Sequence, residues 1–121
     1  MTLPAIAPSL NVWRKWHWTK QGREKEAFQE LVWGLLNEKG NRCPRGFDEV
    51  EIHSVLMFKM NRRRDGDNFG AVLYKWFQDV LVQQKVIPDD TSDRCTSHPP
   101  KIVVGEKEQT TLMLQLRVRE R

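Results

Sequence analysis

Two aspartates stand two residues apart in the segment RRRDGDN, at Asp65 and Asp67, directly after three arginines. In an extended chain the side chains at i and i+2 point the same way, so these carboxylates lie close together. At ~4 Å they repel each other by about 4 kcal/mol at an effective dielectric of about 20. A divalent cation removes this penalty, and oxygen ligands without thiolates favour Mg²⁺, Mn²⁺ or Ca²⁺.

An EF-hand calcium loop does not account for this acidic pair. A loop that begins at Asp65 has Phe69 at its fifth position and Trp76 at its twelfth, and neither side chain ligates calcium. A structural interpretation remains open, in which Asp67 or Asn68 caps the helix that follows. The arginine run likewise remains open as an ordinary solvated surface.

A second acidic pair, Asp89 and Asp90, follows the far end of the next predicted helix. If the chain doubles back after that helix, three carboxylates can meet. Three carboxylates beside a basic surface suit hydrolysis of a phosphodiester, because a metal ion neutralises developing charge and activates water. The preceding arginines would hold the DNA backbone. These are Arg62, Arg63 and Arg64.

Hydrophobic patterns predict the elements that carry these residues. Apolar residues at helical spacing predict helices over about 19–39 and 68–85. Alternation predicts strands over about 49–60 and 110–120, with weaker strands before Pro8 and over 94–98. Pro99 and Pro100 make the 94–98 segment an edge strand or a broken one. The order (β)αβαββ predicts an α/β fold, an α+β sandwich with two main helices on a small mixed sheet.

Length and composition narrow the class of protein. A chain of 121 residues predicts a single domain over 1–121. With 20 basic and 16 acidic residues the net charge is +4, which favours a polyanionic partner. Cys43 and Cys95 form no CxxC motif and no Cys/His ligand spacing, so a zinc site is not expected, and free thiols are favoured. No apolar run reaches ~18 residues and no signal peptide is recognisable, so we expect a cytoplasmic protein without a membrane partner.

The chain resembles the RusA family of Holliday-junction resolvases in four features: the segment RRRDGDN, the segment VIPDD, the helix between them and two late strands. The segment PSLNVWRKWHW and the charged helix after it are also similar to that family's N-terminal part, so the resemblance covers nearly the whole chain. It implies a Mg²⁺-dependent endonuclease, with Mn²⁺ as a substitute, that cuts four-way junctions or other branched DNA in recombination and repair. It also implies a homodimer, because a junction has two-fold symmetry and needs paired cuts. Host and phage origin both stay open.

The resemblance assigns site residues one by one. The family's two strand-end carboxylates match Asp65 and Asp67, and its third carboxylate matches Asp90, so these three would hold the metal ion. The family's catalytic lysine matches Lys75, which lies four residues before Asp79 and fifteen before Asp90.

The position of Lys75 departs from the family pattern. Counted from Asp67, the family's lysine falls on Ala71, so four extra residues precede Lys75. Four residues are about 1.1 helical turns, so Lys75 keeps the same facing but sits ~6 Å further along the helix. A surface lysine paired with Asp79 remains an alternative.

Other candidates for DNA contact lie near the N-terminus. Trp13, Trp16 and Trp18 can stack on exposed bases, although packing in the core or in a dimer is expected for at least one of them. Four basic residues can contact phosphates: Arg14, Lys15, Lys20 and Arg23. The histidines His17, His53 and His98 form no recognisable ligand set, and the methionines are expected in the core.

Two other functions remain open. One is a non-catalytic DNA-binding module on the same fold, which metal-dependent cleavage would distinguish from the nuclease. The other is a small regulatory or assembly protein whose acidic loop is only structural, which salt-dependent DNA binding would exclude.

Overall fold

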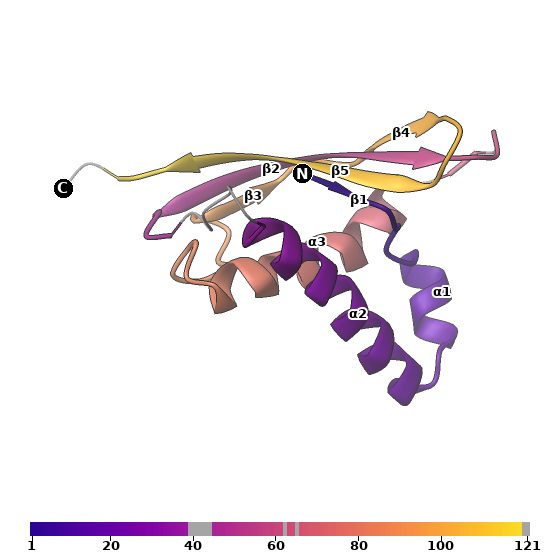
Figure 1. The fold of residues 1–121 in the computed structure, drawn as a ribbon, viewed down its shortest axis with the longest axis horizontal. Coiled ribbons are helices and arrows are strands. Elements are labelled where there is room, and N and C mark those ends of the chain that lie inside the picture. Colours follow the sequence, from indigo (N-terminus) through magenta and orange to yellow (C-terminus); the bar gives the residue numbers. More distant parts are fainter. Residues whose placement is uncertain (39–44, 62, 65, 120–121) are drawn as a thin grey trace.

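The computed structural model describes residues 1–38, 45–61, 63–64 and 66–119. Along the chain its elements are β1 (Thr2–Leu3), α1 (Leu10–Lys15), α2 (Trp18–Leu36), β2 (Glu49–Phe58), α3 (Gly66–Gln83), β3 (Cys95–Ser97), β4 (Lys101–Val104) and β5 (Gln109–Arg117). Figure 1 shows one sheet with the helices on one side of it. A mixed sheet of five strands with packed helices confirms the predicted fold class.

The long strand β2 lies at the centre of the sheet. Antiparallel β5 pairs along one edge of β2, from Glu49 opposite Arg117 to Met57 opposite Gln109, and β1 pairs with the outer edge of β5. The other edge of β2 pairs in parallel with β3 and, further along, with β4. Pro99 and Pro100 separate these two short strands because proline donates no ladder hydrogen bond. The prediction that 94–98 forms an edge or broken strand is confirmed, whereas the strand β4 was not predicted.

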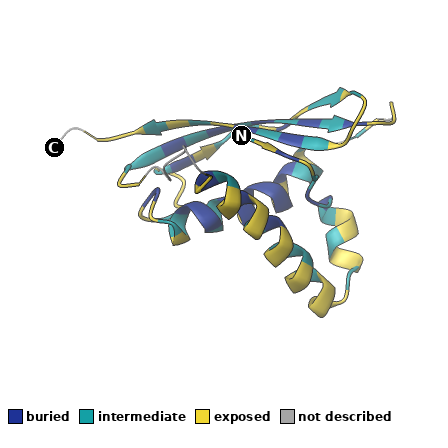
Figure 2. Ribbon diagram, viewed as in Figure 1, coloured by how far each residue is buried: buried dark blue, intermediate teal, exposed yellow. Residues whose placement is uncertain are grey.

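The side chains of β2 alternate between the two faces of the sheet, as strand geometry requires. Even-numbered residues from Val50 to Phe58 are buried beneath the helices, and odd-numbered residues from Glu49 to Met57 are half-buried on the opposite face. Figure 2 shows the same alternation of burial along the sheet. Polar residues at the odd positions therefore face away from the helices.

One hydrophobic core joins the helices to the sheet. Phe77 and Leu81 of α3 and Val32 of α2 are fully buried in it. The rings of Phe28 and Trp76 lie 5.6 Å apart and hold α2 against α3. Each such side chain contributes ~1.5–3 kcal/mol through its burial, so the orientation of α3 is well fixed. Within the described ranges, no helix combines the length and the apolar character needed to cross a membrane.

The N-terminal helices differ from the sequence prediction. Ser9 caps the short helix α1, which was not predicted, by accepting a hydrogen bond from the backbone N–H of Val12 at 3.3 Å. His17 caps α2 by accepting from the backbone N–H of Thr19 at 3.3 Å. The helix α2 ends at Leu36, and the predicted stop at Gly40 lies outside the described residues.

Two other expectations need correction. Met60 and Met113 are 61% and 48% exposed, so these methionines are not core residues. The helix α3 begins at Gly66, so neither Asp67 nor Asn68 is its N-cap. The side chain of Asn68 instead accepts a hydrogen bond from the backbone N–H of Asn11 at 3.3 Å and ties α1 to α3.

Candidate functional site

The basic segment lies where β2 ends and α3 has not yet begun. Arg62 and Asp65 fall outside the described residues. The Arg64 guanidinium stacks 3.8 Å from the centroid of the Phe58 ring and donates to the carbonyl of Met60 at 2.9 Å. Arg63 is exposed. The two described arginines therefore differ, because Arg64 is tied to its own strand end and Arg63 projects into solvent.

Asp67 lies in the first turn of α3 and is exposed. Its negative charge is favourable there because a helix N-terminus carries partial positive charge. This turn packs closely on the junction between β3 and β4. A Cβ atom at Gly66 would lie 3.1 Å from the Pro100 carbonyl oxygen, and one at Gly70 would lie 3.1 Å from Pro100 Cδ. Two glycines therefore permit the approach that places Asp67 beside the proline pair.

Lys75 lies in the middle of α3 between two carboxylates. Its ammonium is 3.2 Å from Asp79 and 3.3 Å from Asp90. Hydrogen bonds to Asp79 and then to Asp90 raise the pKa of Lys75 above its ordinary value. Asp90 follows the end of α3 by seven residues, so the chain does double back along the helix, as expected.

The neighbour of Asp90 has a different role. Asp89 accepts hydrogen bonds from the Thr91 hydroxyl at 2.7 Å and from the Thr91 backbone N–H at 3.2 Å, and these lower the pKa of Asp89. Its other oxygen lies 3.5 Å from Arg94. Asp89 therefore stabilises the turn, and Asp90 is the member of the pair that faces Lys75.

A surface hollow of about 320 Å³ connects the first half of α3 with the proline junction. Asp67 and Lys75 both contribute to its wall. The remaining lining residues are Gly70, Ala71, Tyr74, Gln78, Ser97, Pro99 and Pro100. The hollow thus places one carboxylate and one ammonium on the same open surface.

Asp67 and Asp90, the two predicted carboxylates that the structure describes, do not form one cluster. Asp67 precedes Lys75 by eight residues, which is ~12 Å along a helix axis. In the part of the chain that the structure describes, neither Asp67 nor Asp90 belongs to a group of three residues close enough to hold one metal ion. Asp65 lies outside those residues.

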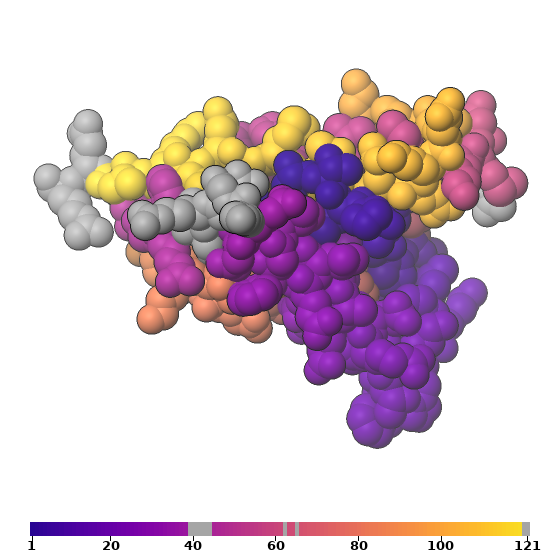
Figure 3. Space-filling model, viewed as in Figure 1, coloured from indigo at the N-terminus to yellow at the C-terminus, as the bar shows by residue number. Residues whose placement is uncertain are grey.

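The predicted DNA-contacting residues near the N-terminus lie on a protruding arm. Residues of α1 and α2 extend away from the sheet and form the lower projection in Figure 3. Arg14, Lys15, Lys20 and Arg23 are all exposed there. Trp18 is 74% exposed, and the Trp16 ring lies 4.5 Å from the Lys20 ammonium. Trp13 packs against the core, as expected for at least one of these tryptophans.

A cluster that sequence reasoning missed lies on the open face of the sheet. Glu51 and His53 of β2 meet His98, which follows β3, and the structure groups the three as possible metal ligands. The sequence spacing did not indicate that His53 and His98 meet, because parallel pairing of β2 with β3 joins residues 45 positions apart in the sequence. The alternation that places Glu51 and His53 on the same outward face can be read from the sequence. The neighbouring strand that supplies a third residue cannot.

Comparison with known proteins does not assign the chain to a family. No protein-family model matches it, and no curated protein matches it. The similarity to RusA-type resolvases therefore stays a prediction from the motifs and their spacing.

Proposed function

We propose that this protein is a metal-dependent endonuclease that cuts four-way junctions or other branched DNA. One observation carries the proposal. The lysine that the motif spacing selects, Lys75, has its ammonium within 3.3 Å of Asp90, the carboxylate that the same spacing selects fifteen residues later. This contact joins two of the residues that the resemblance assigns to the site.

The type of donor in this region fits Mg²⁺. Asp67 and Asp90 are exposed carboxylates, and Mg²⁺ binds one or two carboxylate oxygens while keeping several waters. Asp65, the third predicted ligand, lies outside the described residues. When bound, Mg²⁺ or its substitute Mn²⁺ would supply an activated water and neutralise charge on the phosphate.

Lys75 would act on the phosphate that is being cut. Its raised pKa keeps the ammonium protonated at neutral pH. A protonated ammonium can donate to a phosphate oxygen and stabilise the negative charge that develops during attack. The hydrogen bond between Lys75 and Asp79 would remain and orient the Lys75 side chain. The contact between Lys75 and Asp90 would be replaced by contacts of each group with the DNA and the metal ion.

Basic residues in two regions of the chain would hold the DNA. Arg63 projects beside the start of α3, and Arg14, Lys15 and Lys20 lie on the arm formed by α1 and α2. These side chains can contact phosphates, and the exposed Trp18 ring can stack on an unpaired base. Two copies of the chain would match the two-fold symmetry of a junction and allow paired cuts.

A second candidate function is a DNA-binding module without catalysis. The observation that favours it is that, among the described residues, neither Asp67 nor Asp90 belongs to a group of three residues close enough to hold one metal ion. With its lysine and third carboxylate neutralising each other, the protein can bind DNA and still lack an assembled metal site.

Cleavage of a four-way junction, compared with a duplex of the same sequence, tests the proposal. We expect symmetric nicks with Mg²⁺ or Mn²⁺, binding without nicks in Ca²⁺, and loss of nicks in Asp90→Asn and Lys75→Gln. Asp93→Asn is the matched control because Asp93 is an exposed aspartate in the same loop.

Each outcome has a defined meaning. Equal cleavage in EDTA would overturn the metal mechanism. Salt-dependent binding without cleavage under any metal would select the non-catalytic module. Absence of both binding and cleavage would reject both DNA functions.

A further inference from the structure

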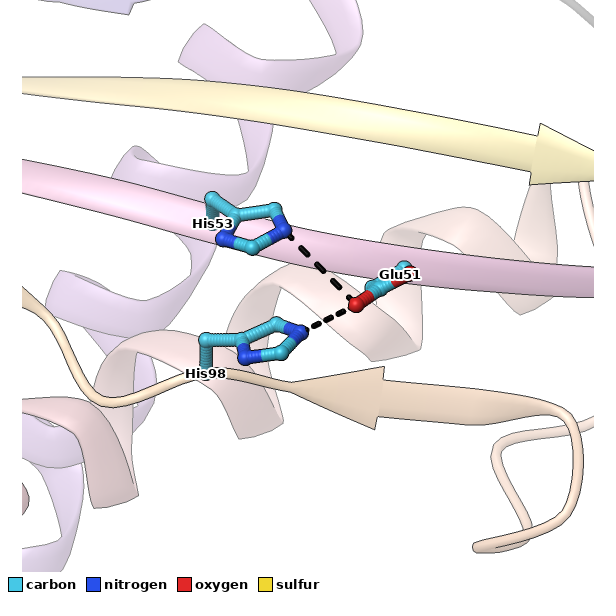
Figure 4. Close-up of side chains that lie close together, drawn as sticks. All are labelled: Glu51, His53 and His98. Carbon is cyan, nitrogen blue, oxygen red and sulfur yellow. Dashed lines mark hydrogen bonds and ion pairs between the residues drawn. The ribbon is translucent and has the colours of Figure 1, made fainter.

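The cluster of Glu51, His53 and His98 has the geometry of a binding site on a face of the sheet that the helices leave open. Figure 4 shows Nε2 of both histidines directed at the same carboxylate oxygen of Glu51. His98 Nε2 contacts that oxygen directly, and His53 Nε2 lies 3.8 Å from it. The two imidazole rings stack with centroids 4.0 Å apart and planes inclined by 8°. Three potential ligand atoms therefore converge on one small region.

Two strands fix the positions of these ligands. Glu51 and His53 are two residues apart on β2 and share its outward face. His98 is fixed next to them because its backbone N–H donates to the Ile52 carbonyl at 2.9 Å. Its own carbonyl accepts a hydrogen bond from the buried Tyr74 hydroxyl of α3. The ligand atoms are thus held by the fold and not by long flexible loops.

Arg117 on the neighbouring strand orients the carboxylate. Its guanidinium lies 3.3 Å from Oε2 of Glu51, which leaves Oε1 facing the two histidines. The hydrogen bond from His98 is the largest cause of the lowered pKa of Glu51, and the nearby charges of His98, Arg117 and His53 add to it. An ionised carboxylate oxygen with two imidazole nitrogens is a ligand set for transition metals, whereas Mg²⁺ prefers oxygen alone.

The spacing of the ligand atoms is compatible with one ion. All three potential ligand atoms lie within 4.8 Å of one another. Two ligands at ~2.0–2.1 Å from a tetrahedral zinc ion are ~3.3 Å apart, so His53 Nε2 must move inward from 3.8 Å while the direct contact between His98 Nε2 and Glu51 Oε1 must open. His53, whose side chain is 44% exposed, can make this movement by rotating its ring.

We propose that Glu51, His53 and His98 bind one divalent transition metal ion, with Zn²⁺ as the expected species and water in the remaining coordination positions. This site lies on the opposite face of the sheet from α3, so it is separate from the Mg²⁺ site of the proposed nuclease. Its ligands join the central strand to the end of edge strand β3. Metal binding therefore stabilises the folded sheet, because an unfolded chain does not keep these residues together.

Titration of the purified protein with Co²⁺ and then Zn²⁺ tests the proposal. We expect visible absorption of low-symmetry Co²⁺ at about one ion per chain, displacement of that ion by Zn²⁺, and no displacement by Mg²⁺. X-ray absorption of the Zn²⁺ form should show nitrogen and oxygen at ~2.0–2.1 Å and no sulfur at ~2.3 Å, which excludes binding by the cysteines.

Three variants make the test specific. His53→Gln and Glu51→Gln should each weaken Zn²⁺ binding at least about tenfold and remove the rise in urea midpoint that Zn²⁺ gives the wild type. His53→Gln is the less disruptive change because the ring is exposed. His17→Asn is the matched control, since His17 is the third histidine, lies at the start of α2, and asparagine is also a good N-cap.

Each variant must be folded before it is compared, and the urea transition of its metal-free form shows whether it is. Loss of binding in His53→Gln with full binding in His17→Asn supports the site. Binding that survives both His53→Gln and Glu51→Gln would overturn the proposal, as would a wild type that gives no Co²⁺ spectrum or a spectrum of thiolate ligation. None of these results depends on nuclease activity.

Discussion

The hydroxyl of Tyr74 connects α3 to the strand junction, and its removal should have a large and specific effect. Tyr74 donates to the carbonyl of His98, so the Ser54 hydroxyl at 2.7 Å must be the donor in the bond between Ser54 and Tyr74. Ser54 is 4% exposed and Tyr74 is 9% exposed. Burial is the largest cause of the raised pKa of Tyr74, so the phenol is neutral throughout the working pH range.

The expected cost of Tyr74→Phe follows from the groups that it leaves behind. The change removes two hydrogen bonds, each worth ~0.5–1.5 kcal/mol net. It also leaves the buried Ser54 hydroxyl without its acceptor, which costs ~1–3 kcal/mol where water cannot reach. We therefore expect a loss of about 2–6 kcal/mol in the free energy of unfolding from these terms.

A double-mutant cycle separates this explanation from simple loss of packing. Ser54→Ala removes only one hydrogen bond and should cost ~0.5–1.5 kcal/mol. In the double variant no hydroxyl is left unpaired, so the combined cost should fall short of the sum by at least ~1 kcal/mol. Thr110→Val is the control, because the buried Thr110 hydroxyl donates to the Ala5 carbonyl at 2.8 Å and shares no partner with Tyr74.

Urea unfolding followed by tryptophan fluorescence measures these energies, since Trp76 is only 4% exposed. The slope of the transition should stay constant among the variants. If Tyr74→Phe and Ser54→Ala add within ~0.5 kcal/mol, the two hydroxyls are not coupled and the reasoning is refuted. Tyr74→Phe with Thr110→Val should add within that limit.

Three further predictions use the other contacts. Arg63→Ala should weaken binding to junction and duplex alike and lower the slope of log K against log salt by up to ~0.9, whereas Lys85→Ala, an exposed lysine after α3, should leave that slope unchanged. The pKa of Glu51 is lowered on folding, so its contribution to stability is present above about pH 4.5 and is lost as the pH falls further. Glu51→Gln should therefore flatten that part of an acid unfolding curve. An unchanged curve would contradict the contacts assigned to Glu51. Asp67→Ala should cost ~0.3–1 kcal/mol in EDTA through lost interaction with the N-terminus of α3, and should gain less stability from Mg²⁺ than the wild type; an equal gain would remove Asp67 from the metal site.

Local pattern was sufficient for most of the secondary structure. The alternation of β2 and the apolar stripe of α3 predicted their faces correctly, because side-chain direction repeats every two residues in a strand and every 3.6 in a helix. Pro99 and Pro100 correctly predicted that the strand over 94–98 lies at an edge or is broken, because a missing N–H acts at its own position, whereas β4 was not predicted. The helix α1 was missed because it spans only six residues and buries none of them.

Spacing along one helix also predicted part of the candidate site. Lys75 and Asp79 are four residues apart, so their ion pair follows from helix geometry alone. Asp90 joins them only because the chain turns back after α3, and a turn of this kind depends on contacts such as those of Asp89 with Thr91 and Arg94. The distance of Asp67 from Lys75, in contrast, follows from helix geometry, because both residues lie on α3 and are eight positions apart.

The sequence by itself determined which residue types are present and which face of its own element each one occupies. It placed Glu51 and His53 together on one face of a strand, since that relation depends only on the strand's period. Only the tertiary structure decided that His98 joins them, because the parallel pairing of β2 with β3 is set by the crossover through α3 and by the core beneath it. Contacts between distant segments depend on how whole elements pack, and no local periodicity encodes that register.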